Sequence, residues 1–246
     1  MTILAIEASR LTRHYDGETL WIEPWGKNSL RVRATRRASI EATDWALLPA
    51  TPAEARVTID GDAATIENGE ITARLNREGW LSFVNRRGEV LLEEFWRNRR
   101  DVKRFASPLN LAGRELQPIP GAGFQITQRF EAVRGEKIFG LGQYQDPCLD
   151  KKGSVLELAH RNSQCSVPFA LSNRGYGFLW NNPAVGRVAF ANNVTEWTVR
   201  SSPQLDYWVT AGDTPAQIEE QYAAATGTVP MMPEFGLGFI QCKLRY

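Results

Sequence analysis

Glu157 and His160 are the residues of this sequence whose types and spacing suit acid–base chemistry on a sugar. A carboxylate and an imidazole that reach the same substrate can exchange protons with it, as the epimerisation of an aldose requires. The other histidine, His14, lies in no context that suggests a Ser–His–Asp triad. Gly140-Leu141-Gly142 lacks the third glycine and the following helix of a dinucleotide-binding site.

A long polar stretch, residues 143–169, surrounds this pair. It is interrupted by Pro147 and Gly153 and lies between two predicted strands. Its chemically versatile side chains are Asp146, Asp150, His160, Arg161, Asn162 and Gln164. Long loops on a rigid β scaffold often bind ligands, so the stretch is a candidate binding loop. A surface connection without ligand contacts is the equal alternative.

Two other groups of side chains do not indicate a site. Arg97, Arg99, Arg100, Lys103 and Arg104 gather in a short segment. An anion site is one interpretation of this cluster, and a solvated loop or strand edge is the favoured one. The three cysteines, Cys148, Cys165 and Cys242, are odd in number and widely spaced, so neither a disulfide framework nor a metal site is predicted.

The composition is that of a globular protein with a neutral partner. The 246 residues carry 29 Lys and Arg against 28 Asp and Glu, which argues against nucleic acid as a partner. The hydrophobic fraction of 43% is sufficient for a large core. The length suits one large β domain or two small domains. A complete (β/α)8 barrel alone needs about 250 residues, so a barrel with another domain in front is excluded.

Short alternating segments separated by turn residues predict a mainly β fold. Strands of this number predict a large antiparallel sandwich of two sheets, because a single open sheet of that size tends to curl or split. The predicted strands are residues 19–23, 30–34, 56–60, 70–75, 80–84, 89–93, 123–132, 166–171, 175–180, 187–190, 197–199 and 205–210.

One helix follows the last strand. Asp213 or Thr214 can cap it, Pro215 suits its first turn, and Gly227 ends it. Ile218, Tyr222 and Ala225 would form its apolar stripe. After a proline-containing linker, residues 235–242 are almost continuously apolar, which predicts a strand buried on both faces, as in parallel sheets and barrels.

Several motifs of the C-terminal half occur in the order typical of one enzyme family. They are Phe139-Gly140-Leu141-Gly142-Gln143, residues 161–169, residues 173–182, Tyr207-Trp208-Val209, Thr214-Pro215 and residues 232–246. From about Ile138 to Tyr246 the chain resembles the N-terminal sandwich of glycoside hydrolase family 31, which contains α-glucosidases and α-xylosidases. Residues 1–137 fit that sandwich only generically.

The resemblance implies a galactose-mutarotase-like sandwich over residues 1–229, followed at 230–246 by a linker and the first strand of a catalytic barrel. It implies a retaining α-glycosidase without a cofactor, whose two catalytic aspartates lie on later barrel strands. The chain would then be the front part of a longer enzyme and inactive alone. A loop of the sandwich helps to shape the sugar pocket in this family, which fits residues 143–164.

The resemblance also indicates which side chains would contact the sugar. Tyr144, Asn162 and Gln164 are the candidates on the loop, and Gln241 is the candidate for the floor of the pocket. The alternative is structural, because Asn and Gln also satisfy buried loop backbone. No residue is assigned a catalytic role or a metal.

A self-sufficient carbohydrate-binding or aldose-epimerase-like sandwich is the alternative function. A hydrogen-bonded pair of His160 and Glu157 in a shallow pocket would support it. The expected partner is a neutral α-linked oligosaccharide or glycoside, with no nucleic acid and no membrane. Self-association through residues 235–242 is a further expectation, because an unpaired apolar strand exposes hydrogen-bonding groups. The N-terminus lacks the pattern of a secretory signal, so the cytoplasm is the expected compartment.

Overall fold

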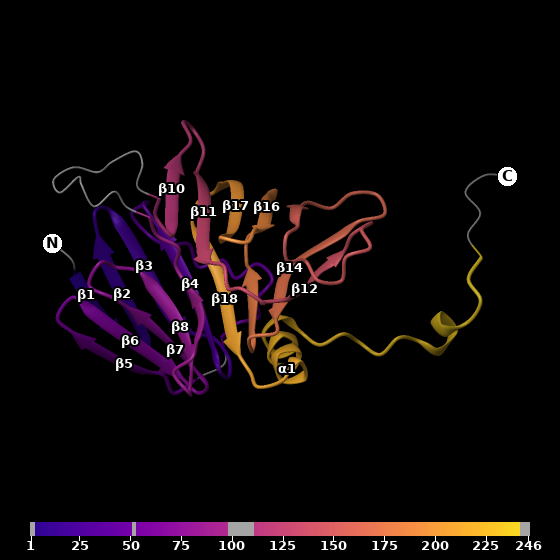
Figure 1. Cartoon of the computed structure of the whole chain (residues 1–246), viewed down its shortest axis with the longest axis horizontal. Coiled ribbons are helices and arrows are strands. Elements are labelled where there is room, and N and C mark those ends of the chain that lie inside the picture. Colours follow the sequence, from indigo (N-terminus) through magenta and orange to yellow (C-terminus); the bar gives the residue numbers. More distant parts are fainter. Residues whose placement is uncertain (1–2, 51–52, 98–110, 242–246) are drawn as a thin grey trace.

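The structure is a computed structural model that describes residues 3–50, 53–97 and 111–241 (Figure 1). These residues form eighteen strands, one α-helix and one 3-10 turn. In chain order the elements are β1 (Ile3–Glu7), β2 (Arg10–Tyr15), β3 (Glu18–Pro24), β4 (Ser29–Thr35), β5 (Arg56–Asp60), β6 (Ala63–Asn68), β7 (Ile71–Leu75), β8 (Leu81–Asn85), β9 (Val90–Glu93), β10 (Arg114–Pro118), β11 (Phe124–Glu131), β12 (Ile138–Gln143), β13 (Val155–Leu158), β14 (Cys165–Ser172), β15 (Tyr176–Trp180), β16 (Gly186–Phe190), β17 (Val194–Ser202), β18 (Leu205–Ala211), α1 (Pro215–Thr226) and the 3-10 turn (Glu234–Leu237).

The strands form three antiparallel sheets in two layers. One layer is an eight-stranded sheet with the order β1-β2-β3-β4-β18-β15-β14-β12. The other layer consists of two five-stranded sheets, β5-β6-β7-β8-β9 and β10-β11-β17-β16-β13. A bridge between Glu94 and Phe130 joins these two at their common border. The predicted antiparallel sandwich with one helix is confirmed, and its second layer is divided in two.

Aromatic side chains fill the space between the layers. Phe178 of β15 and Tyr207 of β18 come from the eight-stranded sheet, and Phe130 of β11 and Trp197 of β17 face them from the other layer. The ring centroids of Phe178 lie 5.1 Å from Tyr207, 4.9 Å from Trp197 and 5.4 Å from Phe130. All four residues are almost completely buried, so this cluster joins the two layers.

The opposite face of the eight-stranded sheet carries a buried ion pair. Arg31 of β4 and Asp206 of β18 are both 0% exposed, and they form a bidentate pair with distances of 2.9 Å (Nε–Oδ1) and 2.6 Å (Nη2–Oδ2). The Arg31 guanidinium also donates to Asp44 Oδ1 at 2.7 Å and to the Thr43 carbonyl at 2.8 Å. Burial acts to lower the pKa of Arg31, but the two carboxylates outweigh this and raise it.

Arginine and tryptophan side chains alternate beside this pair. Arg10 and Arg33 lie over the ring of Trp21, with distances of 3.6 Å and 5.2 Å from guanidinium carbon to ring centroid. Trp25 lies 4.3 Å from Arg31 and 5.9 Å from Arg33 by the same measure. Cation–π contacts of this kind gain strength when they are shielded from water. The row therefore covers the outer face of β3 and β4.

Helix α1 packs on the outer face of the same sheet. Thr214 is its N-cap: Gln217 N donates to Thr214 Oγ1 at 3.3 Å, and Thr214 N donates to Gln217 Oε1 at 3.2 Å. This capping box satisfies backbone groups that the first turn leaves free. Ile218 is buried, and the ring of Tyr222 stacks on Phe169 of β14 with a centroid distance of 3.9 Å. The predicted helix, its cap and its apolar stripe are confirmed.

Residues 235–241 do not form the predicted strand. Glu234–Leu237 is a 3-10 turn, and residues 238–241 have no regular structure, so the strand is absent from this part of the chain, and its formation within a barrel stays a prediction. Residue 242 lies outside the described ranges. In the part that the structure describes, no strand pairs with this segment, and a strand without partners leaves its backbone groups unsatisfied. The segment extends away from the sandwich, with Phe239 93% exposed (Figure 1).

The buried ion pair generates a stability prediction. Arg31→Met should lower the free energy of unfolding by about 3–5 kcal/mol, because it leaves the carboxylate of Asp206 buried without its partner. Arg37→Ala is the control: it removes an ion pair with Glu41 that is 44% exposed on the arginine side, and we expect a loss below about 1 kcal/mol. Urea unfolding of the two variants measures both. Equal losses would contradict the role of the Arg31–Asp206 pair.

Candidate functional site

The predicted binding loop is an arm that connects the two layers. Residues 144–164 leave β12, extend beyond the sheets on the side far from β1, and return as β14 (Figure 1). Within the arm, β13 pairs with β16 of the opposite layer, from Val155↔Ala189 to Leu158↔Gly186. The sequence predicted a loop at this position, so the expectation is corrected for residues 155–158. The arm is held by strand pairing in both layers.

The pairing of β12 with β14 is irregular at the point where the arm leaves the sheet, with three residues of β14 opposite Leu141 of β12. The pairing with β14 passes from Gly140↔Ala170 to Gly142↔Ser166, and both glycines and Leu141 have positive φ angles of 95°, 90° and 69° respectively. A Cβ atom on Gly142 would lie 2.2 Å from the Cys165 carbonyl oxygen. The family motif at residues 139–143 therefore serves a backbone function, because this close approach requires glycine.

Tyr144 anchors the base of the arm. Its hydroxyl donates to the Glu157 carbonyl at 3.0 Å and shares a hydrogen bond of 2.9 Å with Ser166 Oγ. The ring packs against the hydrophobic core, and this burial raises the pKa of Tyr144. Both contacts belong to the arm and to the start of β14. A contact between Tyr144 and a sugar stays a prediction.

Asn162 and Gln164 lie together on the turn of the arm. Arg161 N donates to the Gln164 carbonyl at 3.3 Å, and Gln164 N donates to the Arg161 carbonyl at 3.1 Å, which closes a tight turn. Ser163 has a φ angle of 65° within it. Gln164 Nε2 donates to the Ala159 carbonyl at 3.1 Å, whereas the side chain of Asn162 is exposed. The turn thus presents one free amide and one amide that supports the backbone.

Gln241 is not brought near this turn in the structure. It is exposed and lies in the C-terminal segment that extends away from the sandwich (Figure 1). Its predicted role at the floor of a sugar pocket stays a prediction.

Glu157 and His160 do not form the acid–base pair of the alternative function. The carboxylate of Glu157 pairs with Arg161, which lowers the pKa of Glu157. His160 Nδ1 accepts a hydrogen bond of 3.3 Å from Ser166 N. The two side chains also line different hollows. Proton exchange with one sugar by this pair has no support in this geometry.

Other polar residues of the motifs support the fold. Asn181 Oδ1 accepts from Ala46 N at 3.2 Å, and its Nδ2 donates to the Asp44 carbonyl at 3.1 Å. Asn182 Nδ2 donates to Ser202 Oγ at 2.7 Å. Of the basic cluster, Arg97 pairs with Glu131 at 2.5 Å, and its other members lie outside the described residues.

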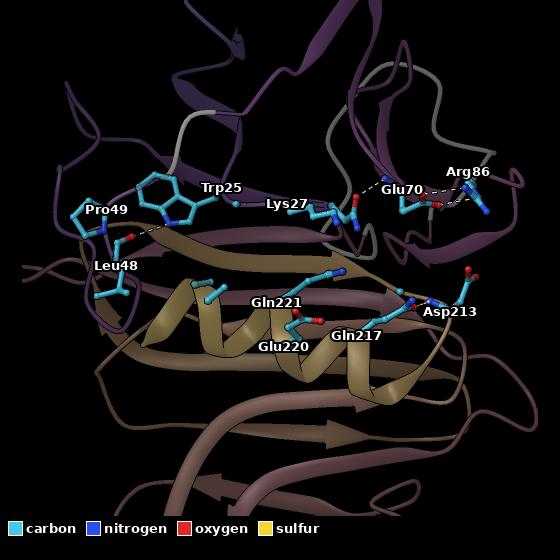
Figure 2. A pocket seen from close by; sticks show the side chains of 15 residues that line it. Trp25, Lys27, Leu48, Pro49, Glu70, Arg86, Asp213, Gln217, Glu220 and Gln221 are labelled. Carbon is cyan, nitrogen blue, oxygen red and sulfur yellow. Dashed lines mark hydrogen bonds and ion pairs between the residues drawn. The ribbon is translucent and has the colours of Figure 1, made fainter. Parts of the chain in front are cut away.

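A cavity of about 550 Å³ runs along α1, and no motif or pattern of the sequence indicated it. Figure 2 shows Trp25, Leu48 and Pro49 at its apolar end, and Glu70 with Arg86 at its charged end. Arg86 pairs with Glu70 at 2.9 Å. The other polar residues of the lining are Lys27, Asn28, Asp213, Glu220 and the two glutamines of α1. Charges of both signs meet here, so the cavity favours neither an anion nor a cation.

The structure offers no site for a metal and no span for a membrane in the part that it describes. Within residues 3–50, 53–97 and 111–241, no three side chains of His, Cys, Asp or Glu gather closely enough to hold a metal ion. The helices of these residues are also too short or too polar to cross a bilayer.

Three comparisons relate the chain to known proteins. Residues 19–188 match the family model described as the glycosyl hydrolase 31 N-terminal galactose mutarotase-like domain. Over its full length the chain is 50% identical to an uncharacterized family 31 glucosidase of Pseudescherichia vulneris and 33% identical to α-xylosidase A of Aspergillus niger. It covers 48% and 35% of these two proteins.

The structural comparison gives the same relatives. A crystal structure of an α-xylosidase from a soil metagenome, complexed with xylose, has a TM-score of 0.93 and 53% identity over 99% of the chain. The chain covers 37% of that protein. It therefore spans about half, or less, of the length of these relatives.

The close approach of Gly142 to Cys165 generates a test with an internal control. Gly142→Ala should destabilise the protein more than Gly153→Ala. Both positions have a positive φ angle, which costs a residue with a side chain about 1–2 kcal/mol, but a Cβ on Gly153 meets nothing within 4 Å. The difference between the two urea midpoints measures the clash with the Cys165 carbonyl. Equal midpoints would contradict the close approach.

Proposed function

Because the chain belongs to glycoside hydrolase family 31, we propose that it is the N-terminal part of an enzyme that hydrolyses terminal α-linked xylosides or glucosides with retention of configuration. The observation that carries this proposal is the likeness, over nearly the whole chain, to an α-xylosidase solved with xylose. A second α-xylosidase among the relatives supports it. The expected partner is a neutral glycoside, and the chemistry proposed for this chain requires no cofactor.

The carboxylates of the arm support an accessory role for this chain. A retaining glycosidase needs two carboxyl groups about 5–5.5 Å apart that flank the bond to be cleaved. Glu157 pairs with Arg161, and Asp146 pairs with Lys151 at 2.9 Å. Asp150 accepts hydrogen bonds from two backbone N–H groups. These groups are engaged in structure, so we assign the catalytic carboxylates to the part of the relatives that this chain does not span.

The turn of the arm is the proposed sugar-contacting element of the chain. Asn162 offers a free amide at its tip, Gln164 supports the turn, and Tyr144 fixes the base. Amides suit the hydroxyl groups of a neutral sugar because they both donate and accept hydrogen bonds. Residues 230–246 are proposed as the linker and first strand of a (β/α)8 barrel, where Gln241 would reach the pocket floor and the strand would find its neighbours.

The cytoplasm is the proposed compartment. The described residues contain two cysteines, Cys148 and Cys165. Both are exposed and have free thiols. Thiols of this kind persist in reducing compartments and oxidise readily outside them.

We expect this chain alone to show no measurable turnover of nitrophenyl α-xyloside or nitrophenyl α-glucoside, because its arm carries no unengaged pair of carboxyl groups. Release of nitrophenol by the purified chain, compared with a mock purification, measures this. Turnover above that control would contradict the accessory role.

A longer protein that contains this chain should hydrolyse both substrates, with the higher kcat/KM for the xyloside. In it, Asn162→Ala and Gln164→Ala should raise KM more than they lower kcat. Leu149→Ala is the matched control, since Leu149 is 78% exposed on the same arm and distant in sequence from the turn. Three variants with the same KM would contradict the role of the turn.

We also expect the chain to self-associate through its C-terminal segment. Val229, Met231, Phe235 and Phe239 are each at least 87% exposed, and such apolar surface is buried when copies associate. Light scattering should give a larger mass for this chain than for a version that ends at Pro230. Equal monomeric masses would contradict this expectation.

A further inference from the structure

An open hollow of about 390 Å³ lies where the arm approaches the eight-stranded sheet. We call it the Trp45 hollow; its lining includes Trp45, His160, Ser166, Pro168, Trp180 and Val185. Among the residues that the structure describes, no Asp, Glu, Lys or Arg side chain lines it, in contrast to the cavity along α1 (Figure 2). A ligand of this hollow therefore meets aromatic, hydroxyl and amide groups and no fixed charge.

Trp45 is held at the hollow in a strained conformation. Its φ angle is 53°, which is rare for a bulky residue, and its side chain is 49% exposed. The backbone on both sides is fixed: Arg31 binds the Asp44 carboxylate, and Asn181 binds the Asp44 carbonyl and Ala46 N. Strain of this kind persists only where the surroundings impose it, and it is concentrated at functional sites. The fold thus presents an indole ring to solvent at a cost in stability.

Two side chains of the lining carry N–H groups, one buried without a partner and one exposed. Trp180 is 1% exposed, and its indole Nε1–H has no hydrogen-bond partner among the described residues. A buried donor without a partner is costly, so a ligand oxygen that reaches it after a small shift of the lining would stabilise it. Neutral His160 accepts from Ser166 N with Nδ1, which places its proton on Nε2 as a second donor.

We propose that the Trp45 hollow binds a neutral pyranoside. An aromatic ring offers a flat apolar surface for the C–H groups of a sugar ring, and indole and imidazole N–H groups suit its hydroxyl oxygens. The described lining residues carry no fixed charge, so an acidic or basic ligand would find no ion-pair partner among them. The proposal goes beyond the proposed function, because it concerns binding by this chain and requires no hydrolysis.

Nuclear magnetic resonance of the 15N-labelled chain tests the proposal, with methyl α-D-xylopyranoside as the probe. The indole N–H signals of Trp45 and Trp180 should shift and saturate. Trp45→Ala should weaken binding about tenfold, which corresponds to about 1.4 kcal/mol, whereas Trp45→Phe should retain most of it. Leu48→Ala is the matched control on the same loop, with a side chain that is 47% exposed, and should leave the affinity unchanged.

Trp45→Gly separates binding from folding. Glycine adopts a positive φ angle without strain, so this variant should unfold at the same or a higher urea concentration than the wild type while it loses the indole stacking surface. Retained affinity in Trp45→Gly would overturn the proposal, as would the absence of saturable shifts at Trp180 and His160. Shifts confined to the turn at Asn162 would also overturn it and would leave the proposed function intact. Tighter binding of glucuronate than of the xyloside would contradict the neutral ligand.

Discussion

The pairing of Arg31 with Asp206 is the interaction on which the arrangement of the eight-stranded sheet depends. It joins β4 to β18 at the centre of that sheet, where the N-terminal strands meet the C-terminal ones. The same guanidinium fixes Asp44, and through it the backbone that carries Trp45. It also lies against Trp25, whose indole donates to the Leu48 carbonyl beside α1. The buried guanidinium of Arg31 thus helps to position both Trp45 and the contact between Trp25 and Leu48 beside α1.

Much of the fold follows from local pattern. On β4, the apolar residues Leu30 and Val32 alternate with Arg31 and Arg33, and the structure buries the two sets on opposite faces. The twelve strands predicted between residues 19 and 210 and the capped helix occur close to their predicted bounds. Period-2 alternation and capping chemistry act over a few residues, so a local pattern is enough to predict them. The arm was predicted for a related reason, since polar residues without periodicity separate two strongly periodic segments.

The remaining features depend on distant residues. Strand β13 has four residues within a polar stretch, and its pairing with β16 decides its conformation. The partner of Arg31 lies 175 residues away, so its burial has no local signal. The left-handed backbone of Trp45 is imposed by neighbours from other elements, against the preference of the residue. Residues 235–241 show the converse case: their pattern suits a buried strand, but a strand forms only where partners exist.

The position of β4 beside β18 also constrains how the chain is synthesised and folded. Translation proceeds at about 5–20 residues per second, so β4 leaves the ribosome roughly 9–35 s before Asp206, the partner of Arg31 on β18. During that interval β4 is the open edge of a growing sheet, and such edges pair readily with other chains. Arg31 and Arg33 place charged side chains on that strand, with Asp44 and Glu23 as their nearby partners, and charged residues of this kind discourage wrong pairing. The same arginine that anchors the finished sheet thereby disfavours wrong pairing of the nascent one until β18 arrives.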